Sequence, residues 1–281
     1  MSEVKLSIDY DQYEDGVKIV ELIEQLAGGE EAASIEKLII GDWGGAYEDD
    51  SSTVVEALVR LKDRFPKLND LFIGDMTYEE CEVSWINQSN LAPLLTAFPG
   101  LKSFTIKGST GLALDPARHD SLEELTIICG GLGKDVLASI SNGSFPKLKK
   151  LELYLGVDNY GFDGDLSDVL PLIEPGKFPE LNYLGLKDSE IQDEIAIAIA
   201  EAPILDQLDT LDLSLGTLTD KGAEALINSV KIKQLKLLDL NYHYMSDEMM
   251  KRWEQTELNV DISDQQEYDD DEDYRYPSLT E

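Results

Sequence analysis

Eight copies of a six-residue pattern, with Leu or another large apolar residue at its first, fourth and sixth positions, run through this chain of 281 residues. Successive copies begin 33, 33, 21, 26, 33, 27 and 27 residues apart. Regular recurrence at such intervals indicates an array in which each unit packs on its neighbours. The first residues of the copies are Ile35, Leu68, Leu101, Leu122, Leu148, Leu181, Leu208 and Leu235.

Each repeat changes its apolar period part of the way through. The first part alternates apolar and polar residues, as in Leu211-Asp212-Leu213, which is the period of a strand with one buried face. The second part is helical in period: apolar residues recur at three and four residues between Val54 and Leu61. Ser51 and Ser52 precede that stretch and are good helix caps. The sequence therefore predicts strands that alternate with helices.

Four predicted helices run into a Phe-Pro pair before the next strand. Proline stops a helix because it has no amide hydrogen and its ring clashes with the preceding turn, while phenylalanine fills the corner. The repeat that begins at Leu101 contains Gly108, Gly111 and Pro116, so we expect no full helix there. The pairs are Phe65-Pro66, Phe98-Pro99, Phe145-Pro146 and Phe178-Pro179.

These patterns, together with helix starts such as the one in residues 218–226, resemble the leucine-rich repeat proteins of the ribonuclease-inhibitor-like type. The resemblance covers roughly residues 30–262. More closely, the chain resembles an uncharacterised family of bacterial cytoplasmic proteins built from such repeats. The resemblance implies an α/β solenoid (horseshoe) with parallel strands on the concave face and helices on the convex face. It implies no particular chemistry.

The chain departs from that repeat family at the end of each strand. The family pattern places Asn or Cys three residues after the last strand leucine, and the Asn bonds to neighbouring backbone. Here the third position holds Ser189, Gly216 and His243 in the best-formed repeats. We therefore expect the turns to satisfy their backbone groups in another way.

A repeat array needs no second core, so we predict one domain with a cap at each end. The N-terminal cap is expected to contain a strand within Val4–Ile8 and a helix near Val17–Leu26, and the C-terminal cap a helix after Ser246 and a strand within Leu258–Ile262. The predicted segments are residues 1–34 (N-terminal cap), 35–245 (eight repeats), 246–263 (C-terminal cap) and 264–281 (acidic tail).

The last segment differs in composition from the rest. Residues 264–281 contain eight acids and one base, including the run Asp269 to Asp273. Like charge at this density resists collapse, so we interpret the segment as a solvated tail. Tyr268, Tyr274 and Tyr276 are interleaved with the acids, which leaves a docked segment as the alternative.

Acidic residues dominate the whole chain and not only its tail. There are 57 acids and 23 bases, a net charge of −34, and the chain without residues 264–281 keeps 49 acids and 22 bases, a net charge of −27. Nucleic acid would be repelled, since its affinity for proteins comes largely from Lys and Arg. Anionic membranes are disfavoured for the same reason. The composition therefore predicts neither nucleic-acid nor membrane binding.

The chain shows no sign of export. Its first residues lack a basic segment followed by an apolar core, and no run of about eighteen apolar residues offers a membrane span. Cys81 and Cys129 are too few for a disulfide framework, although one bridge between them stays open. We expect a monomer in the cytoplasm.

Three repeats of 33 residues carry insertions directly after their strands, which would place the extra residues on a common rim. Such insertions map to loops on one face of a repeat protein, and that face often binds partners. Each insertion contains aromatic residues beside acids. The predicted partner-binding residues, which include neighbouring strand positions, are Asp42, Trp43, Tyr78, Glu79, Glu80, Trp85, Lys107, Tyr154, Asp158, Tyr160, Lys187, Tyr242 and Tyr244.

Aromatic rings beside carboxylates suit a ligand that carries Lys or Arg, because the ring face attracts the cation and the carboxylate pairs with it. Our hypothesis is a non-catalytic scaffold or inhibitor-like protein that engages a basic protein or peptide. In the structural alternative, Trp43, Trp85 and Tyr160 fold inward to fill gaps beneath long loops. The functional alternative is an enzyme accessory or structural protein with a small-ligand or calcium site on the acidic rim.

Strand side chains that face away from the helices should form rows with mixed charge. A partner could use Lys107, Lys150 and Lys187 as anchors for carboxylates. The first row holds Asp70, Ser103, Glu124, Lys150, Tyr183, Thr210 and Leu237; the second holds Phe72, Thr105, Thr126, Glu152, Gly185, Asp212 and Asp239; the next includes Lys107, Tyr154, Lys187 and Asn241.

Patterns for catalysis, cofactors and metals are weak. His119, His243 and Cys129 have no accompanying nucleophile motif, so we predict no enzyme and no cofactor. Residues 163–174 match a calcium loop loosely but lack its central glycine, and helix capping by Asp165 or Ser167 explains them better. Residues 130–135 lack the full phosphate-loop spacing and are interpreted as a linker.

Overall fold

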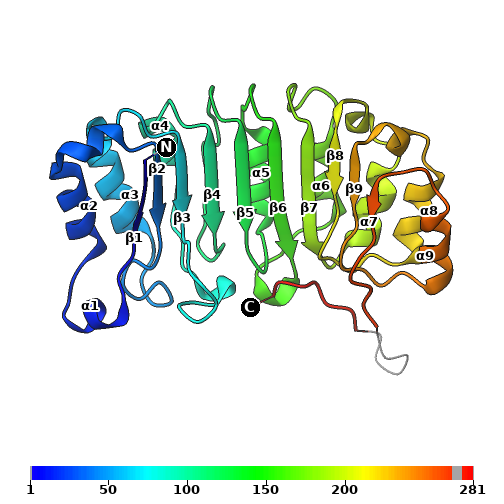
Figure 1. Ribbon diagram of the computed structural model, residues 1–281, viewed down its shortest axis with the longest axis horizontal. Coiled ribbons are helices and arrows are strands. Elements are labelled where there is room, and N and C mark those ends of the chain that lie inside the picture. Colours follow the sequence, from blue (N-terminus) through cyan, green and yellow to red (C-terminus); the bar gives the residue numbers. More distant parts are fainter. Residues whose placement is uncertain (1, 268–273, 281) are drawn as a thin grey trace. The chain divides into compact units, whose positions relative to one another are not determined.

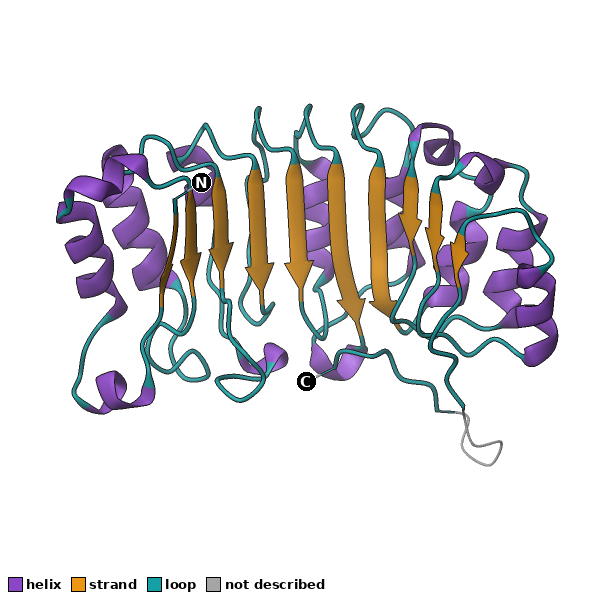
Figure 2. Cartoon of the chain, viewed as in Figure 1, coloured by secondary structure: helices purple, strands orange, loops and turns teal. Residues whose placement is uncertain are grey.

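The computed structural model describes residues 2–267 and 274–280, which fall into two compact units. The first unit comprises residues 2–128 and 142–148, and the second comprises the other described residues. In both, a parallel sheet is built from strands that follow one another in chain order. Figure 2 shows helices on one side of the strands in each unit.

The first unit contains five strands and four α-helices among its described residues. Short 3-10 helices at Glu30–Ser34, Lys62–Arg64 and Val83–Trp85 join them. The longer elements, labelled in Figure 1, are β1 (Glu3–Leu6), α1 (Tyr10–Glu14), α2 (Ile19–Gly28), β2 (Lys37–Ile40), α3 (Ser52–Leu61), β3 (Asp70–Ile73), α4 (Ala92–Ala97), β4 (Ser103–Lys107) and β5 (Glu124–Ile128).

The second unit has the same order of strand, turn and helix. Its 3-10 helices are Asp158–Tyr160, Leu170–Ile173, Pro203–Gln207 and Lys231–Gln234. Its longer elements are α5 (Lys134–Asn142), β6 (Lys150–Gly156), α6 (Leu166–Val169), β7 (Tyr183–Ser189), α7 (Gln192–Ile199), β8 (Thr210–Asp212), α8 (Asp220–Asn228), β9 (Leu237–Asp239), α9 (Asp247–Glu254) and β10 (Val260–Asp261).

The buried strand positions are those that the apolar period predicts. Leu71 and Ile73 in β3, and Leu184 and Leu186 in β7, are fully buried, while Phe72 in β3 and Lys187 in β7 stay partly exposed. The predicted rows are present within each unit, because Asp70 pairs with Ser103 and Ser103 with Glu124, and Lys150, Tyr183, Thr210 and Leu237 are partners in succession.

The Phe-Pro prediction is confirmed. All four phenylalanines lie in the core with at most 4 % of their surface exposed. The repeat that begins at Leu101 carries no helix within its described residues, as its glycines and proline indicate. The buried corner residues are Phe65, Phe98, Phe145 and Phe178.

Strands and helices form in both segments that the sequence assigns to the caps, with shifted boundaries. The predicted N-terminal strand and helix correspond to β1 and α2, and the C-terminal pair corresponds to α9 and β10. The Ser246 Oγ accepts from the Met249 amide at 3.2 Å, so Ser246 caps α9 as expected. Ser51 occupies the corresponding place before α3, but its hydroxyl bonds to Ser89 at 2.9 Å and makes no cap.

Several side chains replace the missing asparagine row. The amides of Gln88 and Gln192 donate to the carbonyls of Lys107 and Leu186 at 2.8 and 3.0 Å. The buried His243 ring bonds to the Ile262 carbonyl at 3.0 Å. Two of these turns are therefore held by a glutamine outside the standard position, and the third by a histidine at the standard position. A further set, Asp212, Asp239 and Asp261, accepts from the amide two residues on, at 2.9 to 3.0 Å.

The remaining sequence expectations concern cysteines and membrane spans. Cys81, in the first unit, and Cys129, in the second, are both buried free thiols. Across residues 2–267 and 274–280, no helix combines the length and apolarity that crossing a membrane needs.

Candidate functional site

Three large aromatic side chains project from the loops that follow β2 and β3 in the first unit. Tyr47, Tyr78 and Trp85 are 52, 60 and 60 % exposed. We call the loops of residues 41–50 and 74–86 the acidic rim, because exposed acids alternate with these rings. The exposed acids of the acidic rim are Glu48, Asp49, Asp50, Glu79 and Glu80.

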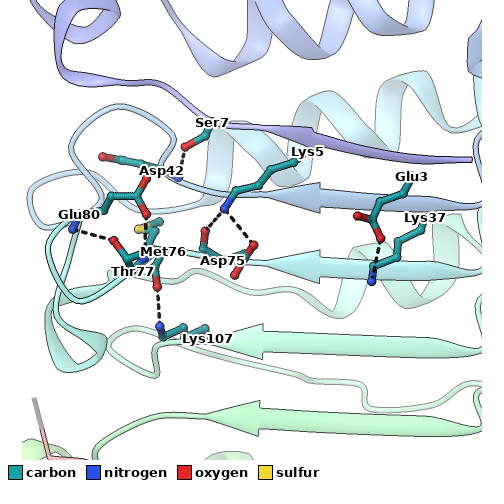
Figure 3. Close-up of polar contacts among 10 residues, drawn as sticks. All are labelled: Glu3, Lys5, Ser7, Lys37, Asp42, Asp75, Met76, Thr77, Glu80 and Lys107. Carbon is teal, nitrogen blue, oxygen red and sulfur yellow. Dashed lines mark hydrogen bonds and ion pairs between the residues drawn. The ribbon is translucent and has the colours of Figure 1, made fainter.

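The first loop of the acidic rim is folded around Asp42. Its Oδ1 accepts from the amides of Gly44, Gly45 and Ala46 at 2.8, 3.1 and 3.2 Å. Gly44 and Gly45 have φ values of 98° and 89°, a region that favours glycine, so the turn depends on both. Figure 3 shows Asp42 beside Ser7, whose hydroxyl accepts from the Asp42 amide at 3.0 Å. Asp42 therefore shapes the loop from within.

Trp43 supports the inward alternative. Only 4 % of its surface is exposed, and its indole Nε1 donates to the Asp49 carbonyl at 2.9 Å. This corrects its placement among the contact residues, because the ring is committed to the core beneath its own loop. Trp85 has the opposite outcome, since most of its ring faces solvent.

The second loop of the acidic rim is fixed by polar contacts drawn in Figure 3. The Lys5 ammonium pairs with Asp75 at 2.9 Å, and the Lys107 ammonium donates to the Met76 carbonyl. The Glu80 carboxylate accepts from the Thr77 amide at 2.7 Å. Lys107 and Glu80 thus hold the loop, whereas Glu79 makes no ion pair or hydrogen bond among the described residues.

Hydrogen bonds between loops set the position of Trp85. The Thr110 hydroxyl donates to the Ser84 carbonyl at 3.1 Å, next to the tryptophan. The amide of Asn87, the residue that follows the second loop, donates to the Ala46 carbonyl at 2.8 Å and ties that loop to the first. Trp85 and the first loop are therefore parts of one connected platform.

The thiol of Cys81, in the second loop of the acidic rim, is not activated as a nucleophile. Burial, together with nearby carboxylates, raises the pKa of Cys81 to about 11. A higher pKa reduces the thiolate fraction near neutral pH, and the thiolate is the reactive form. Cys129, in the second unit, donates its hydrogen to the Tyr154 carbonyl at 3.2 Å.

Lys187 lies at the centre of an ion-pair network on the strand face of the second unit. Its ammonium lies 3.0 Å from the Asp212 carboxylate and 3.3 Å from that of Glu152. It also lies over the Tyr154 ring, 5.2 Å from the centroid. Burial lowers the pKa of Lys187, but the charges of Asp212, Tyr154 and Glu152 outweigh it and raise the pKa overall.

Two neighbours complete this network. The Tyr183 hydroxyl donates to Asp212 at 2.6 Å, and Lys150 pairs with Glu152 at 2.7 Å. The expected anchor residues Lys150 and Lys187 are thus already paired with carboxylates of their own unit. Tyr154 belongs to the same cluster, so this part of the predicted contact set is internal structure.

The loop after β6 is held by a hydrogen bond to Glu190 and by close contact of its backbone with Gly131. The Asp158 amide donates to the Glu190 carboxylate at 3.0 Å, and Asp158 itself is exposed. Tyr160 is half-buried, and a Cβ on Gly131 would lie 2.4 Å from the Tyr160 carbonyl carbon. The glycines near residue 131 therefore allow two backbone segments to touch, which is consistent with a linker.

The residues that loosely match a calcium loop are engaged in local structure. Asp165 caps α6 by accepting from the Ser167 amide at 2.7 Å, as predicted. Asp163 accepts from the Lys134 amide at 2.8 Å, and this bond is the main reason that its pKa is lowered.

Tyr242 and Tyr244 contact the chain's own C-terminal residues. Both hydroxyls donate to the Tyr276 carbonyl, at 3.1 and 3.0 Å. The interpretation of residues 264–281 as a solvated tail is therefore wrong for Tyr276 and for Ser278 and Leu279, whose amides are also bonded. Tyr274 and Tyr276 were the residues in the sequence that indicated a docked segment as the alternative. Tyr268 and the run from 269 to 273 lie outside the described residues.

Parallel strands in chain order, each joined to the next by a turn and in most repeats a helix, define a repeat protein of the α/β class. The chain is similar to a Bacteroides fragilis protein whose crystal structure matches it with a TM-score of 0.88. The two sequences are 39 % identical over 94 % of this chain and 75 % of the other. The chain belongs to the same family as that protein. No protein-family model and no curated protein matches it.

Proposed function

We propose that this chain is a leucine-rich repeat protein of the ribonuclease-inhibitor-like type and that it binds a basic protein or peptide without catalysis. The eight apolar patterns and the parallel strands of each unit support the first part. The acidic rim of the first unit supports the second part. The bound partner would lie on the rim and on the strand face beside it.

The exposure of Trp85 and Tyr78 beside Glu79 carries this proposal. Large aromatic residues usually bury most of their surface, and these two rings are each 60 % exposed on loops that other residues hold in place. A Lys or Arg side chain could stack on a ring while its charge pairs with the neighbouring carboxylate.

The charge of the chain favours the same class of partner. A net charge of −34 raises the local concentration of cationic ligands and speeds their encounter. Lys37, on the strand face of the first unit, is already paired with Glu3 at 3.1 Å and with Asp70 at 3.7 Å. The attraction should therefore be centred on the loops, where acids outnumber bases.

Crosslinking pull-down from the native cytosol at low and high salt tests the proposal, with Trp85→Ala and Glu79→Gln as variants. We expect a defined basic partner whose recovery falls with salt and with either substitution. Glu56→Gln, which removes an exposed acid from α3, is the charge-matched control and should recover the partner fully. Recovery of the same partner at equal yield by wild type, Trp85→Ala and Glu79→Gln would refute the acidic rim as its site.

A further inference from the structure

Residues 276–279 cross the turns at the carboxyl ends of strands in the second unit. The Tyr276 amide donates to the Tyr244 hydroxyl at 3.2 Å. The Ser278 amide donates to the Leu215 carbonyl at 2.8 Å, and the Leu279 amide donates to the Asp188 Oδ1 at 2.7 Å. Figure 1 shows this segment, in red, passing along the strand ends.

The turns that hold the segment share one unusual backbone geometry. Asp188, Leu215 and Tyr242 lie 27 residues apart, each two positions after the last leucine of its six-residue pattern. Their φ values are 55°, 66° and 59°, the left-handed region that non-glycine residues rarely adopt. Such conformations are strained in residues other than glycine and concentrate at active sites and ligand-binding sites. We call these three turns, with Tyr244, the turn track.

The buried carboxyl of Asp188 needs a hydrogen-bond donor from a segment bound on the turn track. Its side chain is completely buried, and its Oδ2 has no hydrogen-bond partner among the described residues. The other oxygen accepts from the Leu279 amide. A buried carboxyl with unmet hydrogen bonds is unfavourable, so an amide donor at this point stabilises the unit. Burial also raises the pKa of Asp188 to about 8.

The segment is held mostly through its backbone. Pro277 is buried against the unit, whereas the rings of Tyr274 and Tyr276 are 67 and 54 % exposed. Backbone donors and acceptors at fixed spacing are the usual means by which proteins bind extended peptides. A second chain with the same spacing of carbonyl, proline and amide groups could make the same contacts.

We propose that the turn track is a binding site for an extended peptide segment of aromatic–Pro–Ser–Leu chemistry, and that residues 274–280 are its resident occupant in cis. A segment of this kind on another molecule binds when it displaces them. The tether gives the resident segment a high effective concentration, so free peptide competes poorly with it in the wild-type chain. This inference does not rest on the acidic rim or on a basic partner.

Limited trypsin digestion of the full chain tests the resident contact, because trypsin cuts after Arg275. Leu279→Pro removes the amide that donates to Asp188, while Leu279→Ala keeps it and serves as the control. We expect the fragment that starts at Tyr276 to be released about tenfold faster from Leu279→Pro than from wild type. The Leu279→Ala rate should stay closer to wild type. Equal rates for all three proteins would overturn the proposed contact.

Fluorescence anisotropy with a labelled peptide of residues 274–280 tests binding in trans. The peptide should bind the full-length Leu279→Pro chain at least about tenfold more tightly than it binds wild type. A matched peptide with an N-methyl group on its leucine lacks the donor to Asp188 and should bind about tenfold more weakly. Equal affinity for the two peptides, or no binding of either to Leu279→Pro, would refute the turn track as a peptide site.

Discussion

Asp188→Asn should change how the stability of the protein depends on pH. Burial raises the pKa of Asp188 from its ordinary value of 3.8 to about 8 in the folded chain. Between these values the folded state binds more protons than the unfolded state, so the free energy of unfolding falls as pH rises. The contribution is complete below pH 3.8 and is lost as pH rises through about 8. Asn does not titrate and should remove this dependence.

The size of the effect follows from the shift. One pKa unit corresponds to about 1.4 kcal/mol, so Asp188 should cost wild type about 4 kcal/mol of stability between pH 5 and pH 8. Asn adds a fixed penalty of about 1–3 kcal/mol, because its amide nitrogen takes the place of an oxygen that has no partner among the described residues. The variant should therefore be less stable than wild type at pH 5 and more stable at pH 8.

Urea unfolding at pH 5, 6, 7 and 8, followed by tryptophan fluorescence, measures this difference. Trp253 is buried in the second unit and reports its unfolding. Asp206→Asn, at an exposed carboxylate of the same unit, controls for the loss of one negative charge. If the difference between wild type and Asp188→Asn stays constant across this range, the account of a buried, neutral carboxyl is wrong.

Three further substitutions test the packing. Gly156→Ala places a Cβ 1.8 Å from the Gly130 carbonyl oxygen at φ 73°, and should lower the urea midpoint far more than Gly176→Ala, which has a φ of 77° and open space. Lys187→Met should cost roughly 3–5 kcal/mol, because it strips a buried ion-pair network of its cation; in the same thermal melts, Lys236→Met at an exposed pair should cost little. Phe145→Ala should cost about 3–5 kcal/mol by chemical denaturation, since it empties a buried corner.

The strands and corners could be predicted because they follow from local period. Alternation in Leu211-Asp212-Leu213 and the pair Phe145-Pro146 depend only on neighbouring residues. The turn contacts could not, because the Gln88 amide reaches the carbonyl of Lys107, and Gln192 reaches that of Leu186. The first bond joins residues 19 apart and the second joins residues 6 apart, and neither follows from the apolar period of the repeat.

The candidate site shows the same limit in its aromatic residues. Trp43 and Trp85 stand in similar acidic surroundings, yet one is buried and the other is exposed. Trp43 turns inward because the Asp42 turn brings its indole to the Asp49 carbonyl. Trp85 is the last residue of a short 3-10 helix, and the Thr110 hydroxyl donates to the carbonyl of Ser84 in that helix. The local composition around Trp43 and Trp85 is similar, so only the geometry of the two loops explains why one is buried and the other exposed.

The acidic rim and the turn track should respond differently to salt, because their contacts differ in kind. Exposed charge pairs weaken as ions screen them, as expected for Glu79 and its neighbours. The turn track offers the Leu215 carbonyl, the tyrosine hydroxyls and a carboxyl that burial keeps largely neutral below its pKa of about 8. Binding of the 274–280 peptide at pH 6 should therefore change little between low and high salt. Capture of the basic partner should fall steeply over the same range. A common salt response for both ligands would contradict this difference between the two kinds of contact.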